Sequence, residues 1–400
     1  MSGLYFYDDS CAREFEPFAL TRPASELRAG AMIVRERWER VTGLESKGFV
    51  GAKHLQDFEE EGAPPFISTG DIPAGSVVVN SRFVVALDAD PKKFDVLMNE
   101  GAGCAVKLAR SLPVKDLIGG KVDIASLQTS MGGRIVAGRW MSNVWDYIAT
   151  LPAQLGEDIP ILGKSLGSSL PRPGDTMGDG DVFIEEGAQI GQYVVFDTTG
   201  GSILIRRGSS IHPFTRLVGP VAIGRDCQVM GDRIATSSIG DWSKIRGEFS
   251  NSIVLGYSNK GHEGFVGHSY FGRWVNLGAL TTTSNLKNTY GNVQLWTPSG
   301  TCDSGQQFLG TFFGDHVKTG IGMMLSTGTV LGAGANVYGS HAPPKAVAPF
   351  SWGDDEPYGE YELSKFLVTA ERAMERRHVT LSAKAKQQLT ESHRARWSAD

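Results

Sequence analysis

The feature that most constrains the fold is a six-residue repeat in the middle of the chain. From Phe313 the sequence divides into the hexads FGDHVK, TGIGMM, LSTGTV and LGAGAN, and IEEGAQ and FGRWVN fit the same frame. The first position is mostly apolar and the second is mostly glycine. Six residues are too few for a helical solenoid, whereas three hexads form one triangular turn of a parallel β-helix with first-position side chains inward. Glycine suits the corner, because it has no Cβ to clash.

The repeat therefore predicts a left-handed parallel β-helix over residues 182–341, the left hand being an exception to the usual crossover rule. A β-sandwich with glycine turns is the alternative. Such a sandwich would show apolar residues at a period of two, with turns roughly every 8–12 residues. The hexads favour the β-helix.

Glycine usage divides the rest of the chain. There are 21 glycines in residues 1–180, 27 in 181–341 and 2 in 342–400. Residues 1–165 mix short apolar runs with the helical patterns ELRAGAMIVRERWERV, PKKFDVLMN and NVWDYIATLPAQL, which is typical of an α/β domain. Residues 166–181 are rich in Ser, Pro and Gly and predict a linker. Residues 342–400 predict a loop and a helical tail.

Composition excludes several classes of function. The 400 residues carry a formal net charge of -5, so no basic surplus indicates nucleic acid or an anionic membrane as a partner. The 4 cysteines are far apart and form no Cys-x-x-Cys pair, which indicates a reducing compartment. No apolar stretch is long enough to cross a membrane, and the first residues lack the pattern of a signal peptide. We therefore expect a cytoplasmic protein.

One glycine-rich run combines residue types that carry chemistry. NKGHEGFVG is followed by FGRWVNLGALTTTSNLKN, and this region resembles the acetyltransferase domain of the bifunctional N-acetylglucosamine-1-phosphate uridylyltransferase and glucosamine-1-phosphate acetyltransferase family. DDS, TRPASELRAG, PFSWG and TAERAMERR extend the similarity to a compact bacterial variant of that family over nearly the whole chain. The resemblance implies a nucleotidyltransferase-like first domain, an acyltransferase β-helix and a homotrimer.

The resemblance also implies roles for single residues. His262 becomes the catalytic base, Asn276 and Asn285 hold the sugar or the acyl donor, and Lys287 meets the phosphates of coenzyme A. Arg246 and Arg216 are candidates for the sugar phosphate, although their spacing differs from that of the family.

Elementary chemistry supports the role of the histidine without the family. With an ordinary pKa of about 6.5, an imidazole accepts a proton at neutral pH as an amine attacks a thioester.

A zinc site is the competing interpretation of the histidines. His262, His268 and His316 could form a three-histidine site shared between subunits, as in a metal-dependent hydratase. His268, however, falls inside the hexad frame, and no acid stands at a suitable spacing to orient a ligand. We therefore expect no metal in the β-helix and a structural role for His268.

The first domain carries weaker signals. Nucleotidyltransferases usually open with a strand and a glycine-rich loop, and the segment YFYDDSCAREFEPF has no such glycines. Asp8 and Asp9 follow the first strand as candidate magnesium ligands, Asn80 ends a second strand, and Arg22 and Arg28 are candidates for phosphates.

Together these features predict an enzyme of nucleotide-sugar synthesis. Its β-helix would acetylate an amino-sugar 1-phosphate with acetyl-CoA, and its first domain would transfer a nucleotide from a nucleoside triphosphate with Mg²⁺, towards a product such as UDP-N-acetylglucosamine. A protein that only binds nucleotide sugars, with a degenerate first domain, is the alternative.

Overall fold

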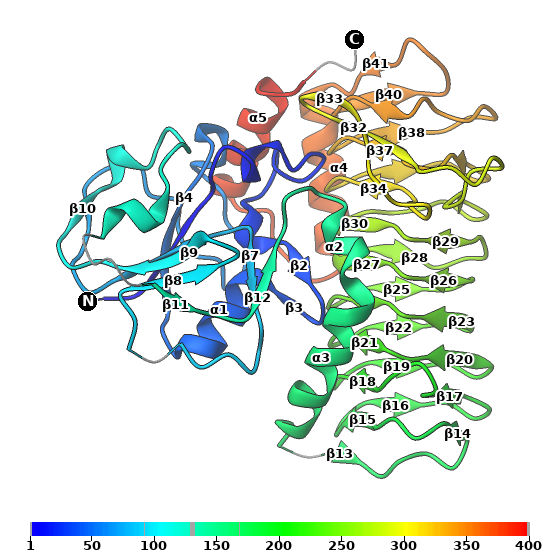
Figure 1. Cartoon of the computed structure of the whole chain (residues 1–400). Helices are drawn as coiled ribbons and strands as arrows, with labels where there is room; N and C mark the ends of the chain where they lie inside the picture. The colour runs from blue at the N-terminus through cyan, green and yellow to red at the C-terminus, as the bar shows by residue number, and fades with distance from the viewer. Residues whose placement is uncertain (1, 92, 129–132, 168, 398–400) are drawn as a thin grey trace. The chain divides into compact units, whose positions relative to one another are not determined.

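The chain folds into two compact units in a computed structural model that describes residues 2–91, 93–128, 133–167 and 169–397. The first unit comprises residues 1–144 together with 382–395, and the second comprises residues 145–381 with 396–400. The predicted architecture of an α/β domain, a β-helix and a helical tail is confirmed (Figure 1).

The first unit is built on a six-stranded mixed sheet. Its strand order is β11-β8-β9-β6-β1-β4, in which β1 pairs in parallel with β4 and β6, whereas β9 is antiparallel to β6 and β8. The six strands are β1 (Leu4–Tyr7), β4 (Ser46–Val50), β6 (Val77–Asn80), β8 (Val96–Asn99), β9 (Ala102–Lys107) and β11 (Arg134–Ile135).

Smaller pieces complete this unit. They are the pairs β2 (Arg28–Ala29) with β3 (Met32–Ile33), β5 (Asp71–Ile72) with β10 (Leu112–Pro113) and β7 (Phe83–Val85) with β12 (Gly138–Trp140), and the helices α1 (Val34–Thr42) and α5 (Ala383–Arg394).

One predicted helix in this unit is wrong. The pattern PKKFDVLMN contains the four-residue strand β8, which pairs with both β9 and β11 in the sheet. Short apolar runs do not distinguish a strand from a helix by periodicity, and here the sheet decides.

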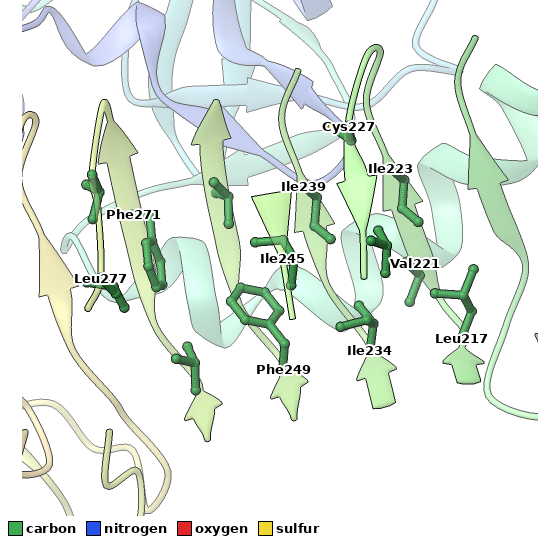
Figure 2. Close-up of a cluster of buried hydrophobic side chains, with 14 of the residues drawn as sticks. Leu217, Val221, Ile223, Cys227, Ile234, Ile239, Ile245, Phe249, Phe271 and Leu277 are labelled. Atoms are coloured by element: carbon green, nitrogen blue, oxygen red, sulfur yellow. The ribbon is translucent and has the colours of Figure 1, made fainter. Parts of the chain in front are cut away.

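The second unit is a parallel β-solenoid of about ten turns across residues 176–353. Each turn runs through three faces in a fixed order, and the strands of successive turns pair in parallel. First-position residues of the hexads, such as Phe271, Leu331 and Val337, are buried in the centre, as the repeat predicts. Figure 2 shows this core, with inward side chains stacked rung upon rung.

The first face contains β13 (Ser169–Leu170), β15 (Val182–Glu185), β18 (Ile203–Ile205), β21 (Val221–Ile223), β24 (Ser238–Ile239), β27 (Ile253–Gly256), β30 (Tyr270–Arg273), β34 (Phe312–Phe313), β37 (Val330–Leu331) and β39 (Ala346–Val347). The second face contains β16 (Gln189–Ile190), β19 (Ser210–Ile211), β22 (Gln228–Val229), β25 (Lys244–Ile245) and β28 (Asn259–Lys260), continued through Asn276 by β35 (Lys318–Thr319), β38 (Asn336–Val337), β40 (Ser351–Gly353) and β41 (Gly359–Glu360).

The third face contains β14 (Thr176–Met177), β17 (Val195–Asp197), β20 (Thr215–Val218), β23 (Asp232–Ala235), β26 (Phe249–Ser250) and β29 (Val266–Gly267). After β29 the pair β31 (Thr282–Thr283) and β36 (Met324–Leu325) follows, and the hairpin β32 (Gln294–Thr297) with β33 (Gly300–Asp303) interrupts the turns.

Helices α2 (Asp146–Ala149) and α3 (Leu151–Lys164) belong to the solenoid unit, although the sequence placed them at the end of the first domain. Helix α3 packs on the strands β18 and β21 of the first face. The contact is close, because a Cβ on Gly163 would lie 2.2 Å from the ring of Phe183. The unit therefore begins at Trp145, ahead of the first hexad.

Helix α4 (Leu363–Glu375) also belongs to this unit. Its apolar side is buried through Phe366, Ala370 and Met374, and Phe366 makes edge contacts with the rings of His316 and Phe350. Among the described helices none is long and apolar enough to cross a membrane.

Candidate functional site

His262 lies at the corner between the second and third faces of the solenoid. It follows β28 and precedes β29, and its side chain is exposed. Its own backbone carbonyl accepts a hydrogen bond from Lys260 Nζ. The imidazole of His262 therefore faces outward, while the inward Lys260 side chain fixes the backbone of the corner.

Lys260 is the supporting group that the sequence did not reveal. Its register partner in the preceding turn is Ile245, so it occupies an inward position, and only 2% of the residue is exposed. Its Nζ also bonds to the Arg246 carbonyl at 2.7 Å. Burial lowers the pKa of this amine to about 8, although the negative charges of Glu263 and Asp232 act to raise it. A lysine at a core position of the hexad frame was the available signal.

The neighbouring turns close around this corner. Glu263 Oε1 pairs with Arg246 Nη2 at 2.6 Å, and both side chains are about half exposed. The Leu280 N–H donates to the Glu263 carbonyl at 3.0 Å from the next turn. The Glu263 carboxylate thus belongs to a surface ion pair, and no hydrogen bond joins it to the imidazole of His262 among the described residues.

The structure does not bring His262, Asn276 and Asn285 together within one chain. Asn276 stands on the second face, where its Oδ1 accepts a hydrogen bond from Asn259 Nδ2 at 2.8 Å. Asn285 lies beyond β31, at the corner between the third and first faces, and its Nδ2 is 2.9 Å from His268 Nδ1. Within the described chain, no hydrogen bond joins His262 to either asparagine.

His268 has the surroundings of a structural residue. It stacks on Phe308 with 5.4 Å between ring centroids, and burial lowers its pKa to about 4. The imidazole is therefore neutral at physiological pH. His262, His268 and His316 stand at three different corners of the triangular turn, so one chain does not gather them around a metal.

The remaining residues predicted for the solenoid lie apart. Arg216 lies on β20 and pairs with Asp197 at 2.6 Å. In the third face β20 is three strands before β29, so the two strands are about 14 Å apart at the usual strand spacing. Lys287 follows β31, and its Nζ donates to the Asn292 carbonyl.

The end of β1 in the first unit carries a compact polar cluster. Asp9 accepts from Arg82 through both carboxylate oxygens, at 2.7 to 3.0 Å, and from Asn80 Nδ2 at 2.9 Å. Burial opposes ionisation, but these donors lower the pKa of Asp9 below its ordinary value. The guanidinium of Arg82 also lies over the Trp140 ring, 5.2 Å from its centroid. Arg82 was not predicted, because nothing in its local sequence marks it.

Asp8 is the unusual member of the pair. It is 3% exposed, and its Oδ2 accepts from the Ala24 N–H at 3.3 Å. Within the part of the chain that the structure describes, its Oδ1 has no hydrogen-bond partner. Burial raises the pKa of Asp8 to about 6, although Ser81 and the Ala24 N–H counteract this effect.

These carboxylates do not fit a magnesium ion in this arrangement. Both oxygens of Asp9 already accept hydrogen bonds, and Asn80 is neutral and directed at Asp9. Magnesium needs ionised oxygen ligands that are free to coordinate it.

Arg22 and Arg28 are also occupied inside the fold. Arg22 forms a bidentate ion pair with Glu60, with N–O distances of 2.8 and 3.0 Å. Arg28 Nη2 donates to the Ala31 carbonyl at 2.7 Å. Both residues are buried, at 2% and 8% exposure. Their contacts stabilise the unit, and the structure shows neither guanidinium directed to the surface.

Comparison with known families identifies the first part of the chain. Residues 4–165 match the model of the family described as sugar nucleotidyl transferase. The first domain is therefore similar to sugar nucleotidyl transferases. The matched segment of the sugar nucleotidyl transferase domain includes α2 and α3, which pack with the solenoid.

Two curated relatives are named as bifunctional proteins. The bifunctional sugar-1-phosphate nucleotidylyltransferase/acetyltransferase of Sulfurisphaera tokodaii is 30% identical over 185 residues, which are 46% of this chain and 39% of the relative. The bifunctional protein GlmU of Nitrosospira multiformis is 28% identical over 115 residues, 27% of this chain and 23% of the relative.

The matches thus span less than half the length of these relatives. The resemblance to bifunctional sugar-phosphate transferases is confirmed, and so is the prediction of a transferase at the level of the family.

Proposed function

We propose that the chain is a bifunctional transferase of nucleotide-sugar synthesis. The solenoid would transfer an acetyl group from acetyl-CoA to an amino-sugar 1-phosphate, and the sugar nucleotidyl transferase domain would join a sugar 1-phosphate to a nucleotide. The family of the first domain and the names of the relatives support the general class. UDP-N-acetylglucosamine is the product that we propose.

The observation that carries the acetyl transfer is the exposed imidazole of His262 on its supported corner. In the reaction the amine nitrogen of the sugar attacks the thioester carbon and loses a proton to the imidazole. The tetrahedral intermediate then collapses, the C–S bond breaks, and the leaving thiolate takes the proton from the imidazolium. One base is sufficient, and it is regenerated.

The remaining predicted residues take supporting roles in this proposal. Asn276, Asn285, Arg246 and Arg216 would contact the sugar phosphate or the acyl donor, and Lys287 the phosphates of coenzyme A. Because one chain spreads these residues over several faces, we propose that the site is completed by neighbouring subunits.

A homotrimer would complete the site and cover the corner that carries His262. That corner exposes Tyr193, Phe214 and Leu280 at 66%, 74% and 58%, and the first two rings stack with 5.5 Å between centroids. Exposed apolar side chains that lie together, as the rings of Tyr193 and Phe214 do, are typical of association surfaces. We expect light scattering to give three times the chain mass, and Phe214→Asp to shift it towards monomer; a wild-type monomer at assay concentration excludes the trimer.

The first test is thiol release from acetyl-CoA with a panel of amino-sugar 1-phosphates. We expect His262→Ala to lower the rate at least about a hundredfold, the usual contribution of a general base. His212→Ala is the matched control, since His212 is also exposed and follows β19 at the corresponding corner of an earlier turn. Equal loss in both variants, or turnover that survives His262→Ala, refutes this role of His262.

The first domain would catalyse attack by the sugar-phosphate oxygen on the α-phosphorus of a nucleoside triphosphate, with release of pyrophosphate. The closed Asp9–Arg82 pair instead favours a second candidate, a domain that binds nucleotide sugars without forming them. Pyrophosphate release with Mg²⁺ distinguishes the two. Its absence, together with measurable binding of UDP-N-acetylglucosamine, supports the binding domain.

The cytoplasm stays a prediction. Its support is the spacing of the 4 cysteines, which forms no Cys-x-x-Cys pair.

A further inference from the structure

A cavity of ≈ 250 Å³ lies where helix α4 meets the second face of the solenoid. It is separate from the corner of His262, which does not line it. The lining residues come from successive turns and from the helix, and they are Tyr257, Asn259, Trp274, Val275, Asn276, Lys318, Thr369, Arg372, Ala373, Arg376 and Arg377.

Four cations line this cavity, and the hydrogen bonds of Lys318 and Arg377 go to neutral carbonyls. Lys318 Nζ donates to the carbonyls of Trp274 and His316 at 3.0 and 3.4 Å. Arg377 Nε donates to the Trp242 carbonyl at 3.4 Å. Over the described residues, no carboxylate forms an ion pair with Lys318, Arg372, Arg376 or Arg377. The cavity is therefore strongly electropositive in a chain whose net charge is -5.

Repulsion between these positive charges destabilises the cavity when no anion is bound. Arg372 and Arg376 are four residues apart on α4, where like charges repel. Lys244 lies one strand before Asn259 on the same face, and burial together with Arg377 and Arg376 lowers its pKa. Burial also lowers the pKa of Lys318 to about 8. A bound anion would relieve both effects, because an opposite charge favours the charged form of each amine.

Aromatic rings form one wall. Trp242 stacks on Tyr257 with 6.4 Å between centroids, Tyr257 contacts Trp274 at 4.5 Å, and Trp274 stacks on His316 at 6.4 Å. This ladder follows the corner between the first and second faces over four turns. A flat ring packs well against such a surface, and the hydrogen-bonded amides of Asn259 and Asn276 stand beside it with donors and acceptors for a base or a sugar.

We infer that this cavity binds the diphosphate and ring of a nucleotide, with the arginines of α4 and Lys318 on the phosphates and the Tyr257–Trp274 wall beside the ring. Guanidinium groups suit phosphate oxygens because their donors form two parallel hydrogen bonds. A diphosphate matches the surplus of positive charge, and the small volume favours a nucleotide over a nucleic acid strand or a peptide.

The cavity shares Asn276 with the residues proposed for acetyl transfer. Neither His262 nor a residue of the first domain lines it, so the proposed catalytic base does not depend on this inference. Three molecules share the required chemistry: a free nucleoside diphosphate, a nucleotide sugar, and the nucleotide end of coenzyme A.

Calorimetric titration of the full chain tests the site. The probes are ADP, UDP, UDP-N-acetylglucosamine, coenzyme A, dephospho-coenzyme A and inorganic pyrophosphate. We expect Arg372→Ala/Arg376→Ala to weaken the binding of at least one nucleotide about tenfold or more, since two charge-assisted hydrogen bonds are lost. Lys365→Ala is the matched control, because Lys365 is an exposed cation of α4 outside the cavity. Lys318→Met provides a second variant with an uncharged side chain of similar length.

The comparison of probes separates the sources. Tighter binding of coenzyme A than of dephospho-coenzyme A supports the nucleotide end of coenzyme A as the ligand. Tighter binding of UDP-N-acetylglucosamine than of UDP supports a nucleotide sugar. If the protein shows neither of these preferences, the result supports a free nucleoside diphosphate. The proposal is overturned if both cavity variants titrate like the wild type, if no nucleotide binds at millimolar concentration, or if pyrophosphate binds as tightly as the nucleotides. The thiol-release assay on the same variants keeps this result distinct from failure of the acetyl transfer.

Discussion

Asp8 is an acid whose burial favours the neutral form. Its pKa of about 6 lies above the value of about 3.8 in an unfolded chain, so the native state binds more protons between these pH values. This contribution to stability is fully present below pH ~4 and is lost as pH rises through about 6. By pH 7.5 the group has lost about 2–3 kcal/mol of stabilisation.

We therefore expect Asp8→Asn to gain about 2 kcal/mol in unfolding free energy relative to wild type between pH 4 and pH 7.5. Urea unfolding at both pH values measures the change. Asp9→Asn is the control with the opposite sign, because Arg82 lowers the pKa of Asp9 and its stabilisation is lost as pH falls. A parallel response of the two variants would contradict the burial effect.

His268 shows the reverse case for a base. Its pKa of about 4 lies below that of an unfolded histidine, so its contribution is present above pH ~6.5 and is lost as pH falls towards 4. We expect the stability advantage of wild type over His268→Asn to shrink by about 1–2 kcal/mol between pH 7.5 and pH 5. Asparagine is the suitable replacement, because His268 has a φ of 49°. A constant difference in chemical unfolding would exclude a buried neutral imidazole.

At the scale of the element, the corner of His262 depends on one glycine. Gly264 has a φ of +124°, and a Cβ there would lie 2.3 Å from the Thr281 carbonyl oxygen of the next turn. Gly322 has a φ of +72° and open space around it. Both packing and backbone conformation therefore exclude a larger residue at Gly264. At Gly322 only the backbone conformation does so.

We expect Gly264→Ala to destabilise the solenoid by about 3 kcal/mol or more and to lower thiol release at least about tenfold, because the corner must shift. Gly322→Ala should cost about 1–2 kcal/mol and leave turnover intact. Thermal unfolding and the thiol assay compare the pair. If the two variants lose equal activity, the close approach at Gly264 does not position the base.

The hexads show how far a local pattern can predict an element. Residues such as Phe271 and Leu331 are inward because every turn repeats the same geometry, so the period alone placed them. Lys260 was missed because it occupies an inward position at which the repeat normally has an apolar residue. The contact of Asn285 was missed because its partner, His268, comes from the preceding turn. The strand β8 was mistaken for a helix because its three apolar residues are too few to show a period.

At the scale of the whole molecule, the chain returns to its first unit through α5. Ser392 Oγ donates to the Leu20 carbonyl at 2.7 Å, Gln388 Nε2 to the Thr21 carbonyl at 3.3 Å, and Leu389 is 5% exposed. The helical pattern of the tail was visible in the sequence, but its destination was not. Contacts across more than 360 residues leave no trace in local spacing.

A stop after Leu381 removes these contacts and should destabilise the first unit by about 2–5 kcal/mol relative to a stop after Ala395. Both forms lack the Trp397–Trp296 and Arg396–Glu360 contacts of the second unit, so the solenoid should be equally stable in the two. A stop after Ala395 is the control, because it retains α5. Calorimetry should show that one transition moves to lower temperature only in the shorter form. Two unchanged transitions would mean that α5 contributes nothing to the first unit.

The return of α5 also sets an order of events during synthesis. A solenoid can add each turn to the previous one as the chain leaves the ribosome, since every rung pairs only with its neighbours. The unit whose strands emerge first must instead wait for residues 382–395. Of the two units, the one that is translated earlier is thus completed later. Until then the nascent chain exposes the surface around Leu20 and Thr21 to any chaperone or partner nearby.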